Sequence, residues 1–471
     1  MNILFLLTGF ASYDEAILIS QFIDQLDETH DCACLSQLLP FSYTNTHPRI
    51  ASGVFAEDKD TNSQNLQKLL EKHNFDLIVW GDIINFLLEG EPFNLSLNWL
   101  TEIDIPICIL DYQDVLKIEQ LETPSLENNN KYMTKISLDN FNNNVKTCHE
   151  VSFHHSNKIY VIKTCPPAKY ENNNDIINLF SSDYMHQKLQ PHILYWKKLE
   201  EFPLVSKYNL REVVDKDLKC NEDTKIIFLI FNPAAFLRTS VIENSFKPDI
   251  HYEAVKNLIC YYLKILMMHN KINCQIFIAN YPRLPNKKDY SLPLSPLDKK
   301  KSSLQIREIP LLTHELYTTL LKVSDLIITE SNWHPALISS VMLEVPSIVI
   351  GSNVAIKEEK GVKKIVSDYT DMDMYVYQTL ESLLKHNPAS IFPYVSYPHE
   401  ITFLPNINMV QNGYFYHITD IFNDERTISL FSELLLNKDY QSDLQTLFSS
   451  IKDRNKEALL AEKIVEIVIY D

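Results

Sequence analysis

The sequence predicts an α/β protein of two Rossmann-like domains, each built on a parallel sheet. Three observations support this class. The chain has 471 residues, too many for one compact core, and this length suits two domains of roughly 200 residues each. Apolar runs alternate with segments of helical period in both halves. The apolar runs are continuous, as expected for strands of a parallel sheet that helices cover on both faces.

The first series of alternating elements occupies the N-terminal half. Residues 2–8 form an apolar run that predicts a buried strand, and residues 15–26 carry apolar side chains at helical spacing. The remaining elements are strands at 32–35, 76–82, 105–112 and 158–164, a helix at 63–73, a helix before 105, and a mostly helical connection at 185–217. They predict an N-terminal domain over residues 1–205, with exposed loops at three asparagine runs.

The second series begins with a strand at 225–233. A helix at 252–268 follows, and its apolar residues form one core-facing stripe. The remaining elements are strands at 274–280, 304–309, 325–329 and 346–350, and helices that begin near 314 and 335. This series predicts a second domain over residues 206–425. Helices over residues 426–471 are then expected to pack on or across the two domains.

Composition excludes several classes of function. The formal net charge is −18 and no long basic stripe occurs, so nucleic acids and anionic lipids are poor partners. The seven glycines are spaced so that neither a P-loop nor a G-x-G-x-x-G motif exists. No apolar run approaches the roughly 18 residues of a membrane span, and no basic residue precedes the first apolar run. The eight cysteines lack zinc-site spacing and fit a reduced compartment, so we expect a cytoplasmic protein.

One stretch of the second half resembles a known superfamily. In "IPLLTHELYTTLLKVSDLIITESNWHPALISSVMLEVPSIVI", residues 309–350, a short helix precedes a strand, a polar turn, a helix and another strand. This order is similar to the C-terminal domain of GT-B glycosyltransferases. The resemblance implies a GT-B-like fold, in which the parallel sheets of the two domains face a central cleft. It also implies a nucleotide-diphosphate sugar as co-substrate, no other cofactor and no bound metal. The chain departs from the pattern at Ser339 and Glu344, where relatives often carry a ribose-binding carboxylate and a glycine.

The polar turn of that stretch is the first candidate binding site. Ligands of an open parallel sheet bind beyond the carboxyl ends of its strands, where Glu330 to His334 lie. Pro335 suits the first helical position, because its missing N–H would have had no partner in the helix. The amides of Ala336 and Leu337 are then expected to meet a diphosphate at the positive end of the helix.

The side chains of the turn offer further contacts. Ser331 or Asn332 could add a hydrogen bond to a phosphate, or could equally cap the helix. Trp333 could stack on a base or a sugar, or could serve packing alone. Trp333 and His334 are bulky, whereas relatives place small residues here so that the backbone can approach the phosphates.

A second candidate site follows the first strand of the second domain. The segment FNPAAFLRTS leaves the carboxyl end of that strand and carries Asn232 and Arg238. Arg238 could clamp a phosphate through two hydrogen bonds and a permanent charge. The alternative is a surface arginine paired with Glu243 or Asp249. Arg283, after the next strand, is a further phosphate-binding candidate.

Three carboxylates of the first domain are candidates for a general base. Asp14, Asp82 and Asp111 each follow or end a predicted strand on the cleft side. A sugar transfer with inversion needs a base to deprotonate the acceptor, and a carboxylate at a strand end suits that task. Each could instead be a helix cap or turn residue, and the sequence does not choose among the three.

Two short acidic and histidine patterns do not predict a metal site. Asp371-Met372-Asp373 matches the D-x-D of metal-dependent glycosyltransferases of another fold, but such patterns arise by chance. His149, His154 and His155 share a loop without the spacing of a zinc site.

The sequence therefore predicts a metal-independent glycosyltransferase that moves a sugar from a nucleotide diphosphate to an unidentified acceptor. One alternative is a non-catalytic binding or partner protein on the same scaffold, which the missing glycines favour. The other is a nucleotide-sugar epimerase, because a scaffold does not determine the chemistry.

Overall fold

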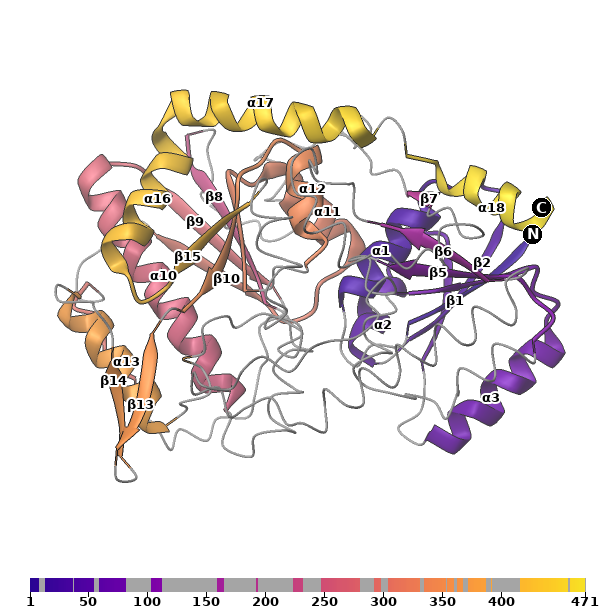
Figure 1. Ribbon diagram of the computed structural model, residues 1–471, viewed down its shortest axis with the longest axis horizontal. Helices are drawn as coiled ribbons and strands as arrows, with labels where there is room; N and C mark the ends of the chain where they lie inside the picture. The colour runs from indigo at the N-terminus through magenta and orange to yellow at the C-terminus, as the bar shows by residue number, and fades with distance from the viewer. Residues whose placement is uncertain are drawn as a thin grey trace.

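The computed structural model has two parallel sheets, one in each half of the chain (Figure 1). It describes residues 1–7, 13–36, 38–54, 59–81, 103–111, 159–164, 192–193, 223–231, 247–279, 292–297, 304–330, 334–352, 354–359, 362–366, 372–386, 391, 416–455 and 458–470.

The first sheet has seven strands in the order β3-β2-β1-β4-β5-β6-β7, and every pairing is parallel. Four successive side chains of β1, Ile3 to Leu6, are fully buried, because helices cover both faces of this central strand. The strands are β1 (Asn2–Leu6), β2 (Asp31–Ser36), β3 (Ile50–Val54), β4 (Leu77–Trp80), β5 (Ile107–Asp111), β6 (Ile159–Lys163) and β7 (His192–Ile193).

The helices of the first domain are α1 (Tyr13–Ile23), α2 (Leu38–Thr44) and α3 (Lys59–Lys72). Every residue of α1 except Gln21 is buried. On one side Phe22 meets Phe5 of β1 edge to face, with ring centroids 6.1 Å apart. On other sides α1 contacts α2 and the second domain. Because α1 is buried on all sides, its sequence, YDEAILISQFI, has apolar residues around the helix and not only along one face.

The second sheet has six parallel strands in the order β10-β9-β8-β11-β12-β15. In both sheets the strand that comes first in the sequence is central. The next two strands add on one side of it, and the chain then crosses to the other side, where β4 pairs with β1 and β11 pairs with β8. Such reversals of strand order are where open α/β sheets bind ligands. The strands are β8 (Lys225–Ile230), β9 (Cys274–Ala279), β10 (Gln305–Ile309), β11 (Leu326–Thr329), β12 (Ser347–Gly351) and β15 (His417–Asp420).

The helices α10 (Pro248–Asn270), α11 (His314–Val323), α12 (Ala336–Met342) and α13 (Met374–His386) belong to the second domain. A hairpin of β13 (Ala355–Glu359) and β14 (Val362–Val366) is antiparallel and lies beside α13 at one end of the molecule (Figure 1). The sequence patterns did not predict this hairpin.

The C-terminal helices α16 (Asp424–Leu436), α17 (Lys438–Asn455) and α18 (Ala461–Tyr470) run from the second domain back to the first (Figure 1). Lys452 of α17 forms an ion pair with Glu344, at the end of α12, at 2.6 Å. On α18, Glu462 accepts a hydrogen bond from the amide of Asp27 at 2.9 Å and contacts His30 Nε2 at 2.9 Å. These contacts attach α18 to the first domain.

The structure confirms the α/β class and corrects some local predictions. The strand β3 and the helix α2 were missed, because both are short and only partly apolar. The mostly helical prediction for 185–217 is wrong at 192–193, which pair with β6 as strand β7. The predicted helix before 105 lies outside the described residues. Within the described part of the chain, no helix combines the length and hydropathy that crossing a bilayer requires.

Candidate functional site

Two predicted site residues from different domains meet where α1 and α12 begin. Asp14 lies in the first turn of α1, after β1, and His334 lies just before α12, after β11. His334 Nε2 is 3.4 Å from Asp14 Oδ1, and both side chains are buried. Because each helix follows the carboxyl end of its strand, the carboxyl edges of the two sheets approach each other at this point.

His334 is electrically neutral in this environment. Burial lowers the pKa of its imidazole from 6.5 to about 3. Its Nδ1 accepts a hydrogen bond from the amide of Ala336 at 3.1 Å, so the ring proton resides on Nε2, the nitrogen that lies 3.4 Å from Asp14 Oδ1. The contact has the distance of an ion pair, but desolvation makes it a neutral imidazole beside a carboxylate.

The two amides predicted to hold a diphosphate have acceptors within the turn. The amide of Ala336 donates to the His334 ring, and that of Leu337 donates to the His334 carbonyl at 3.0 Å. Both residues are buried, with exposed fractions of 0% and 1%. The dihedral angles of Pro335 are helical, φ −58° and ψ −23°, as its place before α12 requires. A diphosphate can reach these amides only if the turn opens.

Glu330, another predicted binding residue, has a buried partner in the structure. Its Oε2 lies 3.4 Å from Nε2 of His251, in the first turn of α10, and the two residues are 1% and 2% exposed. Both follow the carboxyl ends of neighbouring strands, β11 and β8. Sequence reasoning missed His251, because nothing in the segment HYEAV distinguishes it from a surface histidine.

A further buried carboxylate lies beside the reversal point of the first sheet. Glu15, next to Asp14, is fully buried, and its Oε1 is 2.8 Å from the position that a Cβ on Gly81 would occupy. Gly81 directly follows β4 and donates its amide to Leu6 of β1 at 2.8 Å. Glycine at this position therefore allows the carboxylate to approach the backbone closely.

Replacement of Gly81 by alanine is expected to destabilise the protein by about 1–3 kcal/mol, the usual cost of forcing atoms into a packed interior. Gly53→Ala is the matched control: its Cβ would lie 2.8 Å from Leu35 Cδ2, the end of a half-buried side chain that can move aside. Urea unfolding of both variants checks this. Equal losses at the two positions would contradict a tight fit at Gly81.

Several predicted site residues lie outside the described part of the chain. They are Asp82, Asn232, Arg238, Arg283, Ser331, Asn332 and Trp333. Asp111 is placed as the last residue of β5, but its side chain is not described. Of the D-x-D pattern, Asp373 accepts a hydrogen bond from the amide of Tyr375 at 2.8 Å, so it caps the start of α13.

Comparison with known proteins identifies the fold. A family model described as a family of unknown function, DUF6365, matches residues 289–451, which include the GT-B-like stretch. No curated protein matches the sequence. UGT71G1 of Medicago truncatula, complexed with UDP-glucose, has a TM-score of 0.50 at 11% identity, with 99% of this chain and 98% of that chain covered.

Two further solved structures extend over the whole chain. A UDP-glucosyltransferase from Polygonum tinctorium has a TM-score of 0.50 at 10% identity, with 100% of this chain and 99% of that chain covered. A UDP-GlcNAc 2-epimerase from Neisseria meningitidis has a TM-score of 0.43 at 12% identity, covering 100% and 99%. At such identities the likeness shows the fold alone. The chain has the GT-B fold, as the sequence predicted.

Proposed function

We propose that this GT-B protein is a glycosyltransferase that moves a sugar from a nucleotide diphosphate to an acceptor hydroxyl. The observation that carries the proposal is the meeting of the two sheets' carboxyl edges at Asp14 and His334. Reaction partners held at these edges, one by each domain, would lie next to each other. Two proteins of the same fold are described with UDP-glucose or as a UDP-glucosyltransferase, which supports a nucleotide-sugar donor in the second domain.

Asp14 is the proposed general base. It is the one of the three predicted carboxylates that the described residues place against the second domain, at His334. Its carboxylate would accept the proton of the acceptor hydroxyl. His334 is proposed as a positioning residue: it is neutral, and its Nε2 lies 3.4 Å from the carboxylate.

The departing diphosphate is assigned to the segments after β8, β9 and β11. Arg238 would neutralise the charge of the diphosphate. Further hydrogen bonds to it would come from Asn232, Arg283, Ser331 and Asn332. Trp333 would pack against the base or the sugar. The proposal includes no metal in the transfer step and no cofactor besides the nucleotide sugar. The cytoplasm is the proposed compartment, in keeping with the five described cysteines, which are free and buried.

A non-catalytic binding or partner protein is the second candidate. The hydrogen bonds inside the turn before α12 favour it, because the amides of Ala336 and Leu337 already have acceptors. Under this alternative, the Asp14–His334 contact would only hold the domains together.

Thermal unfolding with UDP-glucose, and with GDP-, CDP- and dTDP-linked sugars, tests the proposal. Ligand at 100 times its Kd should stabilise the protein by about 2.7 kcal/mol. Arg238→Ala should lower the affinity about 10- to 100-fold, since a hydrogen bond to a charged group contributes roughly 1.5–3 kcal/mol. Lys300→Ala is the control, because Lys300 lies in the basic run Lys299-Lys300-Lys301 between the predicted strands at 274–280 and 304–309 and is not a predicted site residue. If none of the nucleotide sugars raises the unfolding temperature, the non-catalytic alternative is favoured. Conversion of the sugar without an acceptor would indicate an epimerase.

A further inference from the structure

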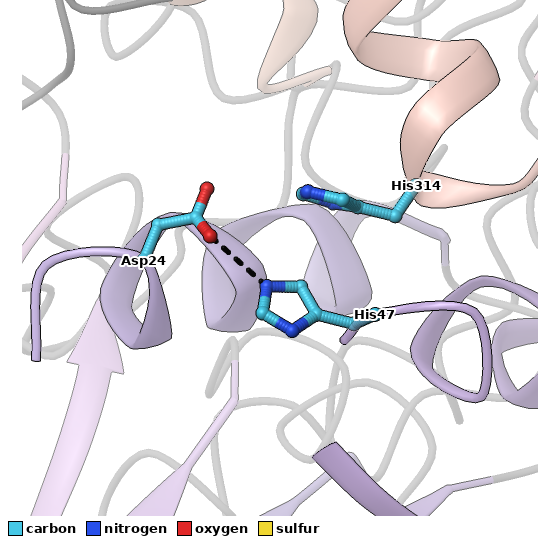
Figure 2. A group of neighbouring side chains, drawn as sticks. All are labelled: Asp24, His47 and His314. Carbon is cyan, nitrogen blue, oxygen red and sulfur yellow. Dashed lines mark hydrogen bonds and ion pairs between the residues drawn. The ribbon is translucent and has the colours of Figure 1, made fainter. Parts of the chain in front are cut away.

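Three side chains with metal-binding atoms converge at the domain boundary, away from Asp14 and His334. They are Asp24, after the last residue of α1, His47, after α2, and His314, the first residue of α11 (Figure 2). One potential ligand atom from each lies within 4.8 Å of the others. Asp24 is ten residues beyond Asp14 along α1, which is about 15 Å at the rise of an α-helix. The cluster is therefore separate from the proposed transfer site.

The three groups face a common point. His47 Nε2 is 3.1 Å from Asp24 Oδ1, and the ring centroids of His47 and His314 are 4.5 Å apart. Figure 2 shows the carboxylate of Asp24 and the ring of His314 directed toward the same space above His47. A tetrahedral ion about 2.0–2.2 Å from each ligand needs ligand atoms roughly 3.4 Å apart. The His47–Asp24 distance of 3.1 Å is close to that spacing, and the His314 atom, within 4.8 Å of the others, has to approach by at most about 1.4 Å.

The first domain holds His314 in this orientation through hydrogen bonds. Its Nδ1 is 3.2 Å from the hydroxyl of buried Tyr43, and its backbone amide donates to Thr46 Oγ1 at 3.1 Å. Because Nδ1 has this contact, Nε2 is the ring nitrogen that would bind an ion. A histidine ligand commonly uses its second ring nitrogen for a hydrogen bond of this kind, which fixes the ring and its tautomer.

We propose that Asp24, His47 and His314 bind a divalent transition-metal cation, with Zn²⁺ the best fit. Two imidazoles and one carboxylate are ligands that zinc accepts, and a water would complete the tetrahedron. The Asp24 side chain is 23% exposed, which gives the ion a route from solvent, whereas the His47 side chain is fully buried. Because two ligands belong to the first domain and one to the second, the ion ties the domains together. This role does not depend on sugar transfer.

Besides the approach of the third group, binding requires a proton shift on His47. His47 Nδ1 accepts a hydrogen bond from the amide of Arg49 at 3.2 Å, so the proton of a neutral ring is on Nε2. An ion on Nε2 needs a lone pair there, so the proton moves to Nδ1, and the hydrogen bonds of His47 to Asp24 and to the Arg49 amide are both lost. No other proton has to leave if the ring is neutral and Asp24 is ionised.

Calorimetric titration of the metal-free full-length protein with Zn²⁺ tests the site. We expect one Zn²⁺ per chain and a higher unfolding temperature in its presence. His314→Gln and His47→Gln should each weaken binding by more than about 100-fold, since loss of a residue that only hydrogen-bonds to a metal ligand already costs roughly 10- to 100-fold. His30→Gln is the matched control, because His30 lies in the first domain and its partner is Glu462 instead of this cluster. It should bind Zn²⁺ as the wild type does.

X-ray absorption spectra of the zinc-loaded wild-type protein give a second measurement that needs no variant to fold. Two imidazoles with oxygen ligands and no sulfur are expected. Sulfur ligands would place the ion on the cysteines and overturn the proposal. It would also be overturned if folded wild-type protein bound no Zn²⁺, or if the variants at His47 and His314, folded by circular dichroism, bound it as tightly as the His30 control.

Discussion

Replacement of Asp14 by asparagine is expected to lower the turnover of sugar transfer by about 100- to 10,000-fold, the range that a positioned general base contributes. Asparagine matches aspartate in shape and can still meet His334, whose Nε2 lies 3.4 Å from Asp14 Oδ1. It cannot take the proton of an acceptor hydroxyl. The donor is assigned to the second domain, so the affinity for UDP-glucose should stay the same. UDP release, measured with the acceptor that gives turnover in the wild type, checks the rate.

Glu15→Gln is the matched control for this experiment. Glu15 is the next residue of the same helical turn and is fully buried, but its carboxylate lies beside Gly81 instead of His334. It should change stability and leave turnover near the wild-type value. If Asp14→Asn keeps its turnover, the base is another group, and Asp82 and Asp111 become the candidates. A loss of turnover and of UDP-glucose affinity together would show that Asp14 acts through the structure of the domain boundary.

The sequence predicted the two sheets because their strands are buried on both faces and therefore read as continuous apolar runs. Strands β1, β8 and β9 are such runs. Short or half-exposed elements were not predicted: β3 consists of exposed and half-buried residues and has no fully buried position. Strand β7 has two residues, too few for any periodicity to detect.

The contact between Asp14 and His334 was not predictable from local pattern, although both residues were candidates. The two positions belong to different domains, and their distance depends on how the domains pack. For the same reason, the cluster of Asp24, His47 and His314 was not predictable from the sequence. Its members have no motif spacing in the chain and meet only because α11 of the second domain begins beside α2 of the first.

The amides of Ala336 and Leu337 show a second reason why the sequence did not predict the site correctly. The prediction treated a helix start as a set of amides available to an anion. In the structure the His334 ring and carbonyl take both hydrogen bonds. A side chain close to the helix start can compete with a ligand for its amides, and sequence alone does not reveal which way the ring turns.

Replacement of Glu330 by leucine is expected to destabilise the second domain by about 3–5 kcal/mol, because it leaves the buried imidazole of His251 without the carboxylate 3.4 Å away. His251→Leu should have a comparable cost, since it leaves the Glu330 carboxylate, only 1% exposed, without that imidazole. The variant with both replacements should lose less than the sum, because a buried polar pair replaced by apolar groups of similar volume is often close to neutral. Urea unfolding of the three variants gives the coupling energy between the two positions.

The double variant also distinguishes a structural role of Glu330 from a role in binding the nucleotide sugar. The sequence predicted contact with the nucleotide sugar, whereas the structure gives the carboxylate an internal partner on α10. If the double variant folds and is still stabilised by UDP-glucose, the pair serves to join α10 to the turn after β11. If it folds but UDP-glucose no longer stabilises it, Glu330 belongs to the donor site, and ligand binding must then draw it away from His251. A coupling energy near zero would contradict the dependence of the two side chains on each other.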